Sequence, residues 1–188
     1  MKRILPVLPV LPVLLLLPAP AMAHGLQDSG TVMAGALHPL GGLDHVLAML
    51  AVGLLAAQMT GRAIWALPAS FVGSMLVGGI IGAAGLPFPA VEPMILASLI
   101  ILGVLVALAT RLPLPALLAM TALFGAAHGW AHGAEGPATG LALYATGFAA
   151  ATALLHLAGI ALGRGLPALV LRGLGAGTAV AGLALALV

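Results

Sequence analysis

The stretch HPLGGLDHVLAML, residues 38–50, opens the first long apolar run outside the N-terminal segment. It places two histidines and an aspartate, His38, Asp44 and His45, within eight residues, and the run then continues without a charge to Met59. About 20 apolar residues suffice to cross the hydrocarbon core of a bilayer. Ionisable groups inside a membrane are costly and usually face the bundle interior or a water-filled cavity. The stretch therefore predicts a membrane helix with a polar, functional edge.

The rest of the chain has the same character. It is 63% hydrophobic and 5% charged, with a mean hydropathy of +1.26 over 188 residues. Short breaks rich in glycine, proline and arginine separate the apolar runs, and the 26 glycines allow close contact between helices in lipid. The fold class we predict is an all-α integral membrane protein, a six-transmembrane-helix bundle. The expected spans are 39–59, 63–84, 91–110, 114–133, 138–162 and 167–188.

The N-terminal segment has the pattern of a secretory signal peptide. Lys2 and Arg3 precede an apolar stretch, and Ala21-Met22-Ala23 resembles a cleavage site. The alternative, an additional transmembrane helix, is opposed by prolines at positions 6, 9 and 12, which interrupt helix hydrogen bonding. We expect a cleaved signal peptide at 1–23 and a permease domain at 24–188 that follows it.

The loop charges predict one orientation. With the mature N-terminus outside, the arginines at 62, 111 and 164 fall in cytoplasmic loops, and Arg172 is close enough to reach that side. This arrangement satisfies the positive-inside rule. It leaves the carboxylates Asp28, Glu92 and Glu135 outside. The location expected is therefore the cytoplasmic (inner) membrane of a bacterium, crossed several times.

Composition also narrows the chemistry. The chain has no cysteine, so disulfides, thiolate nucleophiles and cysteine metal ligands are excluded. It has no basic patch and few aromatic residues, which argues against nucleic acid as a partner. It has no GxxxxGK[ST] motif, so this chain binds no nucleotide through a P-loop, although a companion ATPase subunit stays open.

Two polar clusters stand out against this apolar background. In a continuous helix, His38 and His45 would lie two turns apart on one face, with Asp44 beside His45 as a ligand or as an orienting acceptor. Gly41 and Gly42 would let another backbone come close. The second cluster is HGWAHGAE, in which His128, His132 and Glu135 have the spacing i, i+4, i+7 of a single helical stripe.

The expected topology brings the two clusters to the same depth. His45 lies about 9 Å below the outer edge of its span, and His128 lies about 8–10 Å below the same edge. Two imidazoles one turn apart can hold one transition-metal ion. The alternative is that these groups only join helices, but polar contacts in membranes contribute about 0.6 kcal/mol on average, which is little for so many ionisable groups. We therefore favour a metal site formed by His38, Asp44, His45, His128, His132 and Glu135.

Two further histidines are secondary candidates. His156 lies toward the cytoplasmic half of its span, near Thr152, and could be a lower ligand, a proton-relay group or a packed core residue. His24 would be the N-terminal residue after signal cleavage. Its α-amino group and imidazole could then chelate an ion together, or it could merely follow the cleavage site.

Both motifs resemble those of the HupE/UreJ family of nickel permeases. The residues that carry the resemblance are His38-Pro39, Gly42 and Asp44-His45 in the first motif, and His128-Gly129, His132-Gly133 and Glu135 in the second. The resemblance covers essentially the whole mature chain. It implies uptake of nickel, in some members cobalt, for hydrogenase or urease maturation. One departure is Ala127, where the family pattern often has an aromatic residue directly before the first histidine.

The function expected is secondary or facilitative uptake of a divalent transition metal, Ni²⁺ or Co²⁺, with no prosthetic group and no enzymatic activity. Imidazole suits several such metals, so ligand type alone does not select nickel. Histidines must be neutral to bind, so uptake should weaken as pH falls through their titration range. The expected partners are the ion and membrane lipid, with a homo-oligomer left open.

Other functions are less well supported by the sequence. The main alternative is an intramembrane metal-dependent hydrolase that uses the same His/Asp/Glu cluster, with Glu135 as general base. A serine protease is disfavoured because no Gly-x-Ser-x-Gly occurs, and a sensor has no extramembrane domain to support it.

Overall fold

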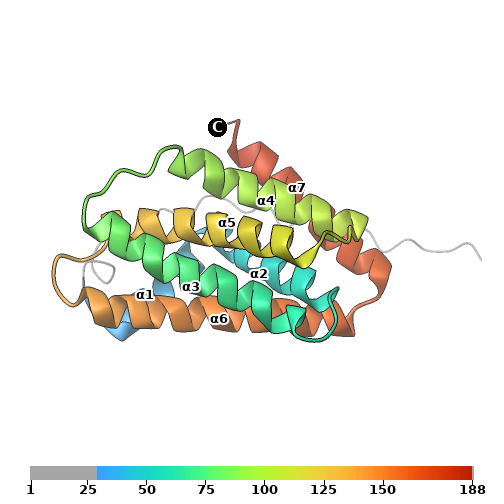
Figure 1. Ribbon diagram of the computed structural model, residues 1–188, viewed down its shortest axis with the longest axis horizontal. Coiled ribbons are helices and arrows are strands. Elements are labelled where there is room, and N and C mark those ends of the chain that lie inside the picture. The colour runs from blue at the N-terminus through green and yellow to red at the C-terminus, as the bar shows by residue number, and fades with distance from the viewer. Residues whose placement is uncertain (1–28, 188) are drawn as a thin grey trace, which may run out of the picture.

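The computed structural model describes residues 29–187, in which every regular element is a helix (Figure 1). The predicted signal peptide and His24 lie outside the described residues. Five helices, α3 to α7, are long and apolar enough to cross a membrane, and the bent pair α1–α2 would make a sixth span. The prediction of an all-α, multi-pass membrane protein is confirmed, whereas six spans remain a prediction. The helices are α1 (Val32–Gly41), α2 (Leu43–Ala57), α3 (Ala63–Ala83), α4 (Val91–Leu108), α5 (Leu114–Ala134), α6 (Leu141–Gly165) and α7 (Ala168–Leu185).

The last five helices begin and end within three residues of the predicted spans. Three of these helices begin directly after a proline or a glycine. Pro113 and Pro167 are the N-cap residues of α5 and α7, and Gly140 precedes α6 with a φ of 73°. Proline needs no hydrogen-bond partner for a missing N–H, and glycine tolerates positive φ, so both residue types mark helix ends.

The first predicted span is wrong as a single straight helix. It is broken at Gly42, whose φ of −108° and ψ of 121° are extended, and α1 and α2 meet at an angle of 90°. Pro39 near the end of α1 has already removed one helix hydrogen bond. A Cβ on Gly42 would lie 2.7 Å from Asp44 Oδ1 and 2.9 Å from His45 Nδ1. The space at Gly42 is thus used by these two side chains, not by another backbone.

Glycines bring the helices together in pairs. The closest pairs are α3 with α5, α4 with α7, and α6 with both α1 and α2. On α5, Gly125, Gly129 and Gly133 face backbone carbonyls of α3, where a Cβ would collide. Small residues allow this approach, and dispersion contacts then hold the pair in lipid. The sequence predicted this use of glycine, and it fixes α5, which carries two of the candidate histidines, against α3.

The arginines gather at one end of the bundle. Arg62 precedes α3, Arg111 lies between α4 and α5, and Arg164 is in the last turn of α6, so the alternating helices place all three at the right-hand end of Figure 1. Arg172 Nε donates a 2.8 Å hydrogen bond to Ala107 O near the end of α4. A cation beside the carbonyls of a helix C-terminus is favourable. The positive charge of the described residues is therefore segregated, as the predicted orientation requires.

Candidate metal centre

Four imidazoles from three helices meet inside the bundle, near the end opposite the arginines. His38 of α1 and His45 of α2 lie against His132 of α5, with ring centroids 4.7 and 4.5 Å from it. His45 also lies 5.1 Å from the ring of His128. The break at Gly42 makes this possible, because two helices at a right angle can each direct one histidine toward α5. The two sequence clusters are thus joined, though through a bend and not through a shared helical face.

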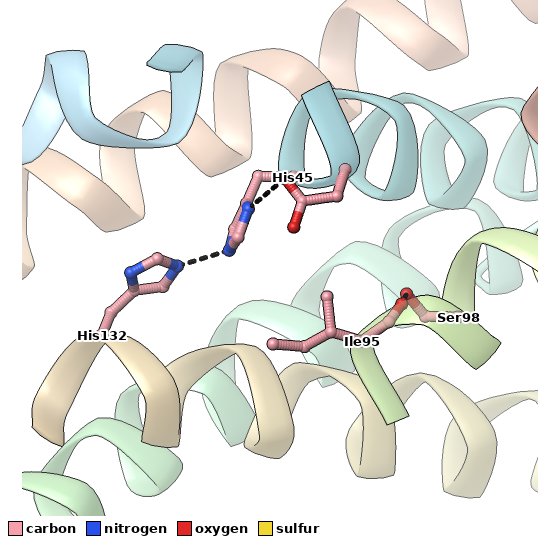
Figure 2. A network of polar contacts seen from close by, with 5 residues as sticks. His45, Ile95, Ser98 and His132 are labelled. Carbon is pink, nitrogen blue, oxygen red and sulfur yellow. Dashed lines mark hydrogen bonds and ion pairs between the residues drawn. The ribbon is translucent and has the colours of Figure 1, made fainter. Parts of the chain in front are cut away.

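A chain of hydrogen bonds orients two of these rings. His45 Nδ1 donates to Asp44 Oδ1 at 2.8 Å, which leaves the lone pair of a neutral imidazole on His45 Nε2. His132 Nε2 lies 2.6 Å from that atom and therefore donates to it. Figure 2 shows His45 and His132 pointing toward one another from α2 and α5. A carboxylate that accepts the second ring N–H is the usual way in which proteins orient a ligating histidine.

His128 is oriented by the backbone. Its Nδ1 is 3.0 Å from Phe124 O, and because a carbonyl only accepts, this nitrogen carries the proton. The lone pair is then on Nε2, which is buried and has no hydrogen-bond partner. The residue is 0% exposed. His128 therefore has one buried nitrogen, Nε2, whose lone pair is free to bind a metal ion.

Four of the five histidines in residues 29–187 have buried ring nitrogens without hydrogen-bond partners. Leaving a buried polar atom unpaired costs roughly 1–3 kcal/mol. One unpaired amide oxygen, Gln58 Oε1, is the only other buried side-chain atom of this kind in residues 29–187. The unpaired histidine atoms are His38 Nδ1, His128 Nε2, His132 Nδ1 and both ring nitrogens of His156. Such a concentration indicates atoms kept free for a ligand.

Aromatic side chains of α6 form one wall of the cluster. Phe148 lies 4.4 Å from His132 between ring centroids, and Tyr144 lies 5.7 Å from His38. Beside them, a cavity of about 430 Å³ opens between α3, α5 and α6, and His132 is the one histidine that lines it. The cavity lies at the end of the bundle where α5 ends and α6 begins. Within residues 29–187, His132 is therefore the member of the cluster that borders this cavity.

Two of the imidazoles, His45 and His132, are hydrogen-bonded to each other, and the four are not arranged around an ion. In residues 29–187, no group of three or more His, Asp or Glu side chains is placed to hold one metal ion. Two nitrogens bound to one ion at about 2.1 Å each, with a right angle between the bonds, lie about 3 Å apart. The 2.6 Å between His45 Nε2 and His132 Nε2 is shorter. Binding through these two atoms would require the rings to separate by a few tenths of an ångström and the proton on His132 Nε2 to move to Nδ1.

Glu135 and His156 lie outside the group of four imidazoles. Glu135 is the exposed C-cap residue of α5, and its N–H still bonds Ala131 O, so it lies about one turn beyond His132. Its role as a ligand stays a prediction. His156 of α6 is 0% exposed and lies apart from the four imidazoles, against Phe71.

The sequence pattern missed several residues that shape the centre. The Phe124 carbonyl, the Phe148 ring and the Phe71 ring all contact histidines, but an apolar residue in an apolar helix carries no distinguishing signal. Among the apolar residues near the site, the pair Gly41-Gly42 was identified from the sequence. We expected this pair to allow the approach of another backbone, whereas Gly42 makes room for the side chains of Asp44 and His45. Polar site residues in a membrane protein can thus be identified from the sequence because polar residues are rare there. The apolar residues that contact them can be identified only from the structure.

Fold and cluster together define a class, a multi-pass helical membrane protein with a buried centre of imidazoles. Comparison with known proteins gives the family. The family described as HupE / UreJ protein matches residues 12–185. Protein HupE of Rhizobium leguminosarum bv. viciae is 44% identical over 153 residues, which are 79% of this chain and 78% of that protein.

The chain belongs to the HupE/UreJ family. This family comprises bacterial membrane permeases associated with nickel uptake for hydrogenase and urease. No solved structure matches the chain.

Proposed function

We propose that this protein takes up a divalent transition metal, nickel first and cobalt second, through the cluster of His38, His45, His128 and His132. The metal is the cargo and not a resident cofactor. A transport site must bind well enough to capture the ion and weakly enough to release it. The hydrogen bond between His45 and His132 suits this need. It pairs the two Nε2 atoms when no ion is present, and it can break when an ion binds.

The observation that carries the proposal is the set of unpaired ring nitrogens. Three of them belong to the four clustered histidines, in a part of the bundle where water has little access. Neutral imidazole nitrogens are good ligands for nickel and cobalt, and poor ligands for Mg²⁺, which prefers oxygen. We assign Asp44 an orienting role through His45, and Glu135 a place at the outer rim, where its charge would attract cations.

The direct test is transport by the purified full-length protein in liposomes. Nickel should accumulate above the level in empty liposomes, excess cobalt should compete with it, and excess Mg²⁺ should not. Competition by zinc but not by cobalt would change the assignment of the cargo. Uptake equal to that of empty liposomes, by protein shown to be folded, would contradict the proposal.

The hydrolase alternative has less support than uptake. A general base must lie within hydrogen-bond reach of the water that it activates. Glu135 is exposed at the end of α5, and Oδ1 of Asp44 is hydrogen-bonded to His45. Turnover of a lipid or peptide substrate by the purified protein would favour the hydrolase over uptake.

The orientation is part of the proposal and gives a separate prediction. Tags inserted at the loops of Arg62, Arg111 and Arg164 should report cytoplasm, and tags near residues 87 and 136 should report the outside. The physical reason is the positive-inside rule applied to short loops. Reporter fusions or cysteine labelling of intact cells measure this, and the chain has no native cysteine to interfere. The reverse pattern would place the histidine cluster on the cytoplasmic side and turn uptake into export.

A further inference from the structure

A single aromatic ring contacts both His156 and His128, a member of the cluster. Phe71 of α3 lies 5.4 Å from His128 and 5.2 Å from His156 between ring centroids. Its plane is at 86° to that of His156, and the side chain is fully buried. No other residue in the described part of the chain makes ring contacts with both of these histidines.

The helix contacts place His156 deeper than the cluster. Thr152 Oγ1 donates to Met75 Sδ at 3.7 Å, and Met75 O faces Gly129, the residue after His128. His156 follows Thr152 by four residues along α6, so it lies about 6 Å further toward the end that carries the arginines. Phe71 precedes Met75 by one turn on α3, which puts its ring at the level of His156.

The ring nitrogens of His156 are available to bind a metal ion. Both of its ring nitrogens are buried and lack hydrogen-bond partners. The nearest hydroxyl along its helix, that of Thr152, is bonded to Met75 instead. Further inward, α2 and α6 approach so closely at Gly53 and Gly159 that a Cβ on either would collide with backbone. An ion at His156 would thus be held between the Phe71 ring and a closed helix contact.

We propose that the Phe71 ring is a gate, and that His156 behind it is a second, inner binding position for the transported divalent metal. The ion passes from His128 Nε2 to a nitrogen of His156 when the phenyl ring turns aside. A phenyl ring makes no hydrogen bond, so its rotation breaks only packing contacts. This inference rests on the proposed function, since it assumes that the clustered imidazoles capture the ion.

The test combines binding and transport of nickel by the full-length protein. Phe71→Leu shortens the barrier, so the maximal rate of downhill nickel flux into liposomes should rise about tenfold, equivalent to ~1.4 kcal/mol on the barrier. Nickel affinity in detergent should stay unchanged, because the clustered imidazoles are intact. Phe71→Trp should slow the flux and also leave the affinity unchanged. The matched control is Leu99→Val on α4, which shortens an equally buried side chain that packs against α7.

A second variant tests the inner position. His156→Phe keeps a planar ring against Phe71 but removes both nitrogens, so the maximal flux should fall while the affinity of the outer cluster is retained. Its thermal stability should rise, because two unpaired buried nitrogens are gone. A purely structural His156 would give the higher stability with normal flux, and that result would overturn the inner position.

The outcomes separate the two proposals. A Phe71→Leu protein that binds nickel and carries it at the wild-type rate would overturn the gate and leave the uptake function standing. If the Trp variant does not fold, the Leu and His156→Phe variants decide. If the wild-type protein itself neither binds nor carries nickel, the uptake function fails and the gate fails with it.

Discussion

Alanine in place of His132 is expected to abolish nickel uptake without unfolding the protein. His132 lines the cavity at the end of the bundle opposite the arginines, contacts His38 and His45, and shares a hydrogen bond with His45. In the proposed uptake function it is a ligand whose bond to His45 must open. Truncation removes its buried, unpaired Nδ1 but leaves His45 Nε2 without a partner, so one cost of roughly 1–3 kcal/mol replaces another and the fold should persist. His45→Ala should have the same effect on uptake.

Two further variants make this result specific. Asp44→Asn leaves an acceptor beside His45 but removes the charge, and the loss of an orienting partner lowers metal affinity by about 10–100-fold, so uptake should weaken and not vanish. Thr178→Ala on α7 removes an equally buried polar group that bonds only Leu174 O on its own helix, and uptake should be normal. Initial rates in liposomes and thermal unfolding in detergent measure both effects. Normal uptake by folded His132→Ala protein would show that the clustered imidazoles are structural.

Much of the fold was predictable because the membrane simplifies the problem. A chain in lipid must satisfy its backbone internally, so long apolar runs become helices. Prolines and glycines then mark where the helices begin, as at Pro113, Gly140 and Pro167. The break at Gly42 was not predicted, because Gly41 and Gly42 were interpreted as a close contact with another backbone. In the structure, Asp44 and His45 occupy the space that a Cβ on Gly42 would fill.

The candidate site was predictable to the extent that its members are polar. Six histidines and four carboxylates in so apolar a chain identify themselves by scarcity, and the structure joins four of those histidines with Asp44. The spacing argument succeeded for His128 and His132, which share an unbroken helix. It failed for His38 with His45, where the helix bends, and for Glu135, the exposed C-cap residue of α5, it stays a prediction. Spacing predicts a shared face only while the hydrogen-bond ladder continues.

The unpaired nitrogens raise the question of what holds them in place. They do not stabilise the fold, since each is a desolvated polar atom without a partner. The stabilisation must come from the helix contacts around them, and the tightest of these join α5 to α3. On α5, the histidines and the glycines occupy adjacent faces. His132 and His128 contact the histidines of α1 and α2, and His128 also contacts Phe71 of α3. The glycines at 125, 129 and 133 face the backbone of α3. The glycine face therefore positions the histidine face.

A methyl group at Gly129 is accordingly expected to disrupt both the fold and the metal centre. The Cβ of Gly129→Ala would collide with the backbone of Met75, which cannot move without displacing α3. We expect a destabilisation above about 4 kcal/mol, the range reached only by exceptional single substitutions. Gly73→Ala is the matched control, because the same change on α3 meets nothing within 4 Å. Monodisperse yield, thermal unfolding and nickel binding in detergent should all fail for Gly129→Ala and stay normal for Gly73→Ala. Equal behaviour of the two variants would mean that α3 and α5 do not pack through their glycines, and the positions of His128 and His132 would then have no such support.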